Sequence, residues 1–156
     1  MKKGDRPLFN MAVPVLLLYD GLCGFCNGTV QWLLKHDKSD RFRFAAQQSG
    51  VAAEILLRHG IDRDQMLQAN SVYLVLDQGT GDERVLQRSD VTIRSLEILG
   101  GFWKFLGQCL QIVPKAMRDS AYNLIARNRF RLAGRYDECP LPAPAERLKF
   151  LGLTDS

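Results

Sequence analysis

The sequence predicts an α/β fold in which a mixed β-sheet is covered by helices on its faces. The expected order is β-α-β-α-β-β, and extra C-terminal helices follow. An uninterrupted apolar run precedes a segment of helical periodicity, and a second strand and helix come next. Two β-rich runs around a glycine-containing turn then predict a hairpin. A β-α-β unit pairs its strands in parallel and a hairpin pairs them antiparallel, so the sheet should be mixed.

The first strand is expected at residues 14–19, because this apolar run has the pattern of a strand buried on both faces. Asp20-Gly21 ends it. Apolar residues then recur at helical spacing over 24–36, which predicts the first helix. Alternating polar and apolar residues predict a half-buried strand at 41–45, and a helical pattern follows at 51–59.

The hairpin is expected from β-rich residues at 71–76 and a returning strand at 83–87. Ser89-Asp90 offers an N-cap for a helix that ends at Leu99. Another helix should begin near Phe102, and Pro114 should open a longer helix that reaches about Leu132.

No linker divides the 156 residues, so we expect one domain over 1–156. Its core should span about 14–100, with a helical extension over about 101–138 and an irregular tail over 139–156. Four cysteines are too few for a disulfide-stapled secreted scaffold, which indicates a reducing compartment. Neither a signal peptide nor the roughly 20 apolar residues of a membrane span is recognisable, so we expect a cytoplasmic protein that does not bind membranes.

Cys23-Gly24-Phe25-Cys26 lies where the first strand gives way to the first helix. The first amides of a helix lack internal partners and the helix dipole is positive there, so a thiolate is stabilised over a thiol. Cys26 shares a helical face with Val30 and Leu33, which directs it inward. We therefore expect Cys23 to be an accessible nucleophile and Cys26 to be the shielded resolving cysteine.

Asp20 is the nearest candidate for the base that Cys26 needs, because a resolving thiol must lose its proton in an apolar setting. Two interpretations remain open. In the first, Asp20 accepts or relays that proton; in the second, it caps the helix start or shapes the turn.

Residues 19–26 resemble the opening motif of the DCC family of predicted thiol-disulfide oxidoreductases, named for its Asp and two Cys. Further similar landmarks are Trp32-Leu33-Leu34, Ser71-Val72-Tyr73, Arg88-Ser89-Asp90, Tyr122 and Arg127-Asn128-Arg129. The resemblance covers roughly Val15 to Cys139. It implies a thioredoxin-like fold and dithiol-disulfide exchange.

The sequence departs from thioredoxin itself before the third core strand. Where thioredoxin has a cis-proline opposite its cysteines, this chain reads Asn70-Ser71-Val72, so the Ser71-Val72 bond should be trans. We expect substrate to dock against Ser71, Val72, Gly24 and Phe25. The substrate could be a disulfide-containing protein or a low-molecular-weight thiol.

Cys109 and Cys139 stand apart from the motif and from each other. Cys109 is expected to fill the core, because its surroundings are strongly apolar. Cys139 either takes an additional redox role or anchors the tail. Structural zinc usually needs four ligands in two close pairs, so we expect no metal, although a site built from Cys23, Cys26 and Cys139 remains an alternative.

The C-terminal third is basic, with eight Lys or Arg against four Asp or Glu between Lys115 and Lys149. Basic and aromatic residues interleave there, namely Tyr122, Arg127, Arg129, Phe130, Arg131, Arg135 and Tyr136. A solvated helix face explains them better than nucleic-acid binding, which we do not expect. A non-catalytic binding module that uses this region is the main alternative to an enzyme.

No glycine-rich nucleotide-binding turn is present, so we expect no cofactor beyond a redox-active Cys23-Cys26 disulfide. An external thiol reductant would then have to supply the electrons.

Overall fold

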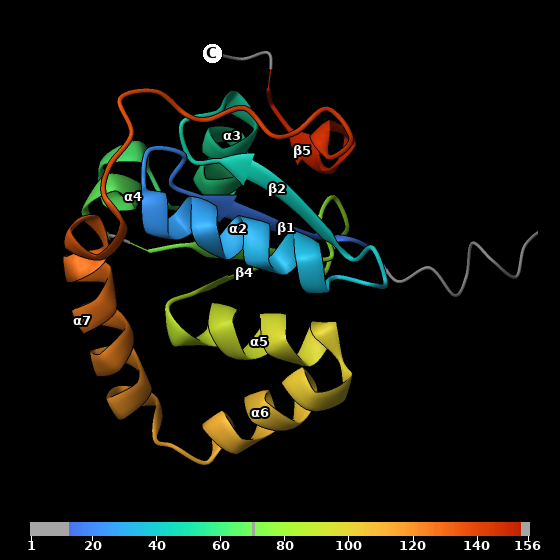
Figure 1. Ribbon diagram of the computed structural model, residues 1–156, viewed down its shortest axis with the longest axis vertical. Coiled ribbons are helices and arrows are strands. Elements are labelled where there is room, and N and C mark those ends of the chain that lie inside the picture. The colour runs from blue at the N-terminus through green and yellow to red at the C-terminus, as the bar shows by residue number, and fades with distance from the viewer. Residues whose placement is uncertain (1–12, 70, 154–156) are drawn as a thin grey trace, which may run out of the picture.

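A computed structural model describes residues 13–69 and 71–153 and contains a five-stranded mixed sheet with helices on both faces (Figure 1). Its elements are β1 Val15–Tyr19, α2 Gly24–His36, β2 Phe42–Ala46, α3 Gly50–Arg58, α4 Arg63–Ala69, β3 Tyr73–Leu76, β4 Arg84–Gln87, α5 Ser89–Leu99, α6 Gly101–Gln111, α7 Lys115–Ala133, a 3₁₀ turn Arg147–Lys149 and β5 Phe150–Leu151.

The strand order is β4-β3-β1-β2-β5. Strand β1 pairs in parallel with β2 and antiparallel with β3, while β4 pairs antiparallel with β3. Helix α2 supplies the crossover that a parallel pair requires. The mixed sheet flanked by helices is thioredoxin-like, which confirms the predicted fold class.

Strand β1 is buried along its whole length, as its apolar run predicts. Because side chains alternate across a strand, Leu17 and Tyr19 face one side of the sheet and Leu16 and Leu18 face the other. The first set packs with α2 and with Val91 of α5. The second set packs with α3 and with Met66 of α4. The cysteine-bearing helix therefore rests on a fully packed sheet.

The C-terminal helices extend one side of this core, as Figure 1 shows. Helix α6 approaches α5 at Gly107, whose missing Cβ leaves room for the carbonyl of Ile93. Cys109 was expected in the core, and this is wrong: it is exposed. The apolar face of α6 that carries Phe102 and Phe105 is likewise exposed, because only the opposite face meets α5.

Three local predictions need correction. Helix α5 begins at Ser89 with Arg88 as its N-cap, and Ser89 instead bonds Asp119 of α7. Helix α4 was missed. The tail was expected to be irregular, but β5 pairs in parallel with β2, because Phe150 packs against Phe44 and Tyr19.

Within residues 13–69 and 71–153, none of the helices combines the length and apolar character that crossing a membrane requires.

Candidate functional site

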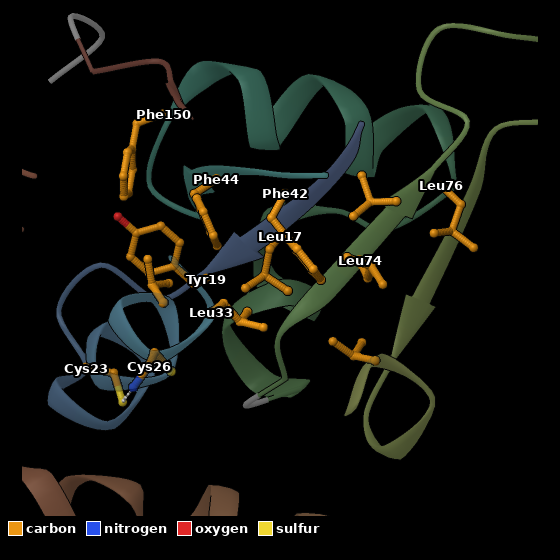
Figure 2. Close-up of a cluster of buried hydrophobic side chains, with 13 residues drawn as sticks. Leu17, Tyr19, Cys23, Cys26, Leu33, Phe42, Phe44, Leu74, Leu76 and Phe150 are labelled. Carbon is orange, nitrogen blue, oxygen red and sulfur yellow. Dashed lines mark hydrogen bonds between the residues drawn. The ribbon is translucent and has the colours of Figure 1, made fainter. Parts of the chain in front are cut away.

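Cys23 is the N-cap residue of α2, so the predicted position at a helix start is confirmed. Its Sγ accepts a hydrogen bond from the backbone N–H of Cys26 at 3.3 Å, drawn as the dashed line in Figure 2. Before it, a turn brings the N–H of Cys23 to the carbonyl oxygen of Asp20 at 3.2 Å. A sulfur that accepts from a helix-start amide is one whose anion the helix can stabilise.

Cys26 lies one turn into α2, with 3% of its surface exposed. It belongs to the cluster that also holds Val30 and Leu33, as its helical spacing predicts. Burial, and to a lesser extent the neighbouring Cys23, raises the pKa of the Cys26 thiol to about 12, although Arg129 opposes the shift. Cys26 is therefore a neutral thiol near pH 7.

Arg129 of α7 joins the two groups that the motif singles out. Its Nη1 lies 3.6 Å from Cys26 Sγ, and its Nη2 lies 3.1 Å from Asp20 Oδ2. Only 7% of its surface is exposed. The interpretation of Arg129 as part of a solvated helix face is therefore wrong, because α7 packs this side chain against the start of α2. Its seven-residue spacing from Tyr122, which places both on one face of α7, is the signal that sequence reasoning missed.

Asp20 holds the turn and the arginine together. Its Oδ1 accepts from the N–H of Leu22 at 3.0 Å and from Gln48 Nε2 at 2.8 Å, while Oδ2 pairs with Arg129. Asp20 shapes the turn, which agrees with part of the second interpretation given above. It does not cap the helix, because Cys23 occupies that position. The proton role stays a prediction.

The segment Gly134–Tyr136, called here the covering segment, lies across Cys23. Gly24 N–H donates to the carbonyl oxygen of Gly134 at 3.1 Å, and Tyr136 N–H donates to that of Leu22 at 2.7 Å. These bonds flank an isolated antiparallel bridge between Cys23 and Arg135.

None of the Cys23 surface is exposed, so the expectation of an accessible Cys23 is wrong for this arrangement. The physical reason is the covering segment, which follows α7 and approaches the helix start from a distant part of the sequence. Gly24 permits the approach, since a Cβ there would overlap the carbonyl oxygen of Ala133.

Cys139 lies farther along the tail, with its Sγ against Gly21, where a Cβ would overlap it. Burial raises the pKa of the Cys139 thiol, a hydrogen bond with Tyr19 opposes the rise, and Asp20 adds to it. Burial likewise raises the pKa of Tyr19, with Cys139 adding to the rise. This placement fits the tail-anchor interpretation. No three His, Cys, Asp or Glu side chains gather as metal ligands in the part of the chain that the structure describes.

The segment before β3 is bonded internally. Ser71 is 1% exposed, and its Oγ accepts from the N–H of Arg88 at 3.1 Å. Val72 N–H donates to the hydroxyl of Tyr122 at 3.1 Å. The Ser71-Val72 bond is trans, as predicted, whereas Asn70 lies outside the described residues. Ser71 was expected to contact substrate, but its side chain is buried and its hydroxyl is hydrogen-bonded inside the protein.

A pocket of about 300 Å³ opens beside Cys26, between α2, α5 and α7. Phe25 and Val72, two of the expected docking residues, line it. The remaining lining residues are Leu17, Tyr19, Cys26, Thr29, Trp32, Leu33, Val91, Thr92, Ser95, Leu96, Tyr122 and Ile125. Gly24 lies instead beneath the end of α7.

Comparison with known proteins agrees with this site. A family model described as DCC1-like thiol-disulfide oxidoreductase matches residues 17–135. The chain belongs to that family. The uncharacterized protein YuxK of Bacillus subtilis (strain 168) is 32% identical over 136 residues, which cover 87% of this chain and 93% of that protein. No solved structure matches the chain significantly.

A plant protein also matches the chain. The DCC family protein At1g52590, chloroplastic, of Arabidopsis thaliana is 32% identical over 126 residues, which cover 81% of this chain and 69% of that protein. The matched range of the family model, 17–135, includes Asp20, both motif cysteines and Arg129. The family thus spans the whole cluster and not the cysteine motif alone.

Proposed function

We propose that this protein is a thiol-disulfide oxidoreductase in which Cys23 attacks a disulfide and Cys26 resolves the product. The observation that carries the proposal is the pair of thiols at a helix start, where the buried Arg129 contacts the second thiol and also pairs with Asp20. The family supports redox chemistry, and the assignment of roles to single residues is ours.

In the first step, the Cys23 thiolate attacks one sulfur of a substrate disulfide. A bond forms between Cys23 Sγ and that sulfur, the substrate S–S bond breaks, and the other substrate sulfur leaves as a thiolate that takes a proton from water. The helix-start amide that already contacts Cys23 Sγ favours the anionic nucleophile.

In the second step, Cys26 loses its proton and its sulfur attacks Cys23 Sγ. The Cys23–Cys26 bond forms, the mixed disulfide breaks, and the reduced substrate departs, so two electrons have passed from the dithiol to the substrate. The buried thiol resists ionisation, and the guanidinium of Arg129 at 3.6 Å favours its anion. Asp20, held by the same guanidinium, is our candidate to receive the proton, directly or through water.

Exchange at Cys23 also requires the covering segment to detach from Leu22 and Gly24. Two backbone hydrogen bonds hold it there, and each contributes on the order of 1 kcal/mol net. An opening of this size leaves a closed resting state and a populated open state. An external thiol reductant would then return the Cys23–Cys26 disulfide to the dithiol, in a reducing compartment such as the cytoplasm.

The test is reduction of a cystine-containing peptide with dithiothreitol as the recycling reductant. We expect turnover above the uncatalysed background by the wild type and none by Cys23→Ser. When reduced Cys26→Ser meets the peptide without dithiothreitol, a mixed disulfide on Cys23 should accumulate and be identified by peptide mass mapping. Cys109→Ser is the matched control, because Cys109 is exposed on α6, and it should keep full activity. Turnover that survives Cys23→Ser would overturn the proposal.

A further inference from the structure

We propose that the pocket beside Cys26 receives an uncharged, apolar side chain of a protein substrate, next to the substrate's disulfide. This inference rests on the proposed function and names the class of its substrate. It selects a peptide disulfide with an apolar neighbour over a small, charged thiol.

The lining of the pocket sets the chemistry of its occupant. Leu17, Leu33, Val91 and Leu96 form its buried wall, and the other lining residues carry no ionised group while Cys26 is a neutral thiol. A charged group placed there would lose its hydration without gaining a counter-ion from the lining, which costs several kcal/mol. The guanidinium of Arg129 contacts Cys26 but does not line the pocket and already pairs with Asp20. The carboxylates of a glutathione-type thiol therefore do not fit inside, whereas a leucine, methionine or phenylalanine side chain does.

Ser95 adds a single polar requirement. Its residue is 7% exposed and lines the pocket, and its Oγ has no hydrogen-bond partner among the described residues. A buried hydroxyl without a partner costs roughly 1–3 kcal/mol, so rotation of the Ser95 side chain toward an occupant that offers one amide or carbonyl group is favourable. The backbone of a bound peptide carries both groups beside each side chain.

The position of the pocket ties its occupant to the cysteines. Phe25, which lies between Cys23 and Cys26 in sequence, is 39% exposed and lines the pocket, and Ile125 of α7 is 46% exposed there. Together with the exposed Thr29 and Thr92 they form the solvent-facing border, while Cys26 forms part of the interior. A side chain that enters past Phe25 holds its own backbone beside the motif, where a neighbouring half-cystine can meet Cys23.

The experiment compares disulfide-linked peptides that differ in one residue next to cysteine, either leucine or glutamate. For Cys23-dependent reduction we expect kcat/KM to be at least about tenfold higher with leucine, since tenfold corresponds to about 1.4 kcal/mol. Thr92→Phe should remove this preference, because Thr92 is exposed and lines the pocket, so a larger ring there fills it. Arg94→Phe is the control on the same helix; Arg94 is exposed and outside the lining.

Binding is measured separately through Trp32, which lines the pocket. The chain has two tryptophans, and Trp103→Phe leaves Trp32 as the only fluorescent one. The probe is the leucine peptide with its cysteine replaced by serine. A saturable change in Trp32 fluorescence that Thr92→Phe abolishes would support the pocket assignment. If this change is seen but no peptide is reduced, the proposed function is rejected and the pocket assignment stands. Equal rates for both peptides, or no saturable fluorescence change, would overturn the pocket assignment while leaving exchange at Cys23 intact.

Discussion

The two sides of the cysteine pair are closed in different ways. On the Cys23 side, the exposed covering segment lies across this residue and is held by backbone hydrogen bonds to Leu22 and Gly24. On the Cys26 side, the buried Arg129 contacts the thiol and pairs with Asp20. In the mechanism proposed above, attack by Cys23 is therefore limited by a local conformational opening, and attack by Cys26 is limited by loss of a proton.

Replacing Arg129 should give the largest effect, because it removes the cation on the Cys26 side. Arg129→Met leaves the partly buried Asp20 carboxylate without this counter-ion, while Leu22 N–H and Gln48 still donate to it, so we expect a loss of about 1.5–3 kcal/mol of unfolding free energy. Resolution of the mixed disulfide should slow by at least about tenfold, since the Cys26 anion loses its favourable neighbour. Urea unfolding and single-turnover release of reduced peptide measure the two effects.

Arg127→Met is the matched control for Arg129, because Arg127 is exposed on the same helix. It should change neither quantity appreciably. Adding Asp20→Asn to Arg129→Met should restore part of the lost stability, since the uncompensated charge is gone. If Arg129→Met unfolds like the wild type and resolves at the same rate, the cation has no role on this side.

Gly24→Ala should act on the Cys23 side. The added Cβ overlaps the carbonyl oxygen of Ala133 and must displace the end of α7 and the covering segment, at a cost of about 1–3 kcal/mol. Alkylation of Cys23 by iodoacetamide should accelerate several-fold. In Gly28→Ala, where nothing lies within reach of the new Cβ, stability should instead rise by up to about 1 kcal/mol.

Equal alkylation rates in the two glycine variants would show that the covering segment does not control access to Cys23.

The sequence alone could not have indicated that the covering segment closes Cys23. It predicted the helix start and the cysteine positions from local spacing, but the covering segment reaches Cys23 from residues 134–136, far along the chain.

Alkaline pH should weaken the fold through the Cys26 side. The pKa of Cys26 is about 12 in the folded protein, above the ordinary thiol value of 9, so between about pH 9 and 12 the unfolded chain holds fewer protons than the native one. Stability therefore falls as pH rises through this window. The raised pKa of Tyr19 acts in the same direction.

Comparing Cys26→Ala with Cys109→Ala isolates the thiol contribution. Denaturant midpoints measured from pH 7 to 10.5 should fall less steeply for Cys26→Ala than for the wild type, whereas Cys109→Ala should follow the wild-type slope. Parallel slopes in all three proteins would contradict the buried, neutral state of Cys26.

Cys139→Ser should give the smallest effect. It tests whether Cys139 helps to hold the tail over the Cys23 side. If Cys139 anchors the tail against Gly21, the change weakens one contact, and Cys23 alkylation should rise no more than about twofold, which corresponds to about 0.4 kcal/mol. Peptide reduction should persist at close to the wild-type rate. Loss of turnover comparable to Cys23→Ser would instead assign Cys139 an additional redox role.

Local patterns were sufficient to predict strands β1 to β4 and the mixed character of the sheet. The apolar run of β1 and the periodicity of α2 placed the cysteines correctly, because both patterns depend on nearby residues. Strand β5 was missed, because two residues are too short to show a pattern and its pairing with β2 is decided by Phe150 packing on distant aromatic rings.

Arg129 shows the same limit within the site. On sequence it was one basic residue among several, and only the packing of α7 against α2 separates it from exposed Arg127 and Arg131. Because Arg129 is buried, the exposed basic face on which the alternative binding-module interpretation relied has one cation fewer.

The most direct test of the central claim is to equilibrate the wild-type protein with mixtures of oxidised and reduced glutathione and to map its thiols by mass spectrometry. We predict that Cys23 and Cys26 lose their thiols together as one intramolecular disulfide, while Cys109 and Cys139 remain reduced. A Cys23 and Cys26 pair that stays reduced at every ratio, or oxidation that begins elsewhere, would contradict the account.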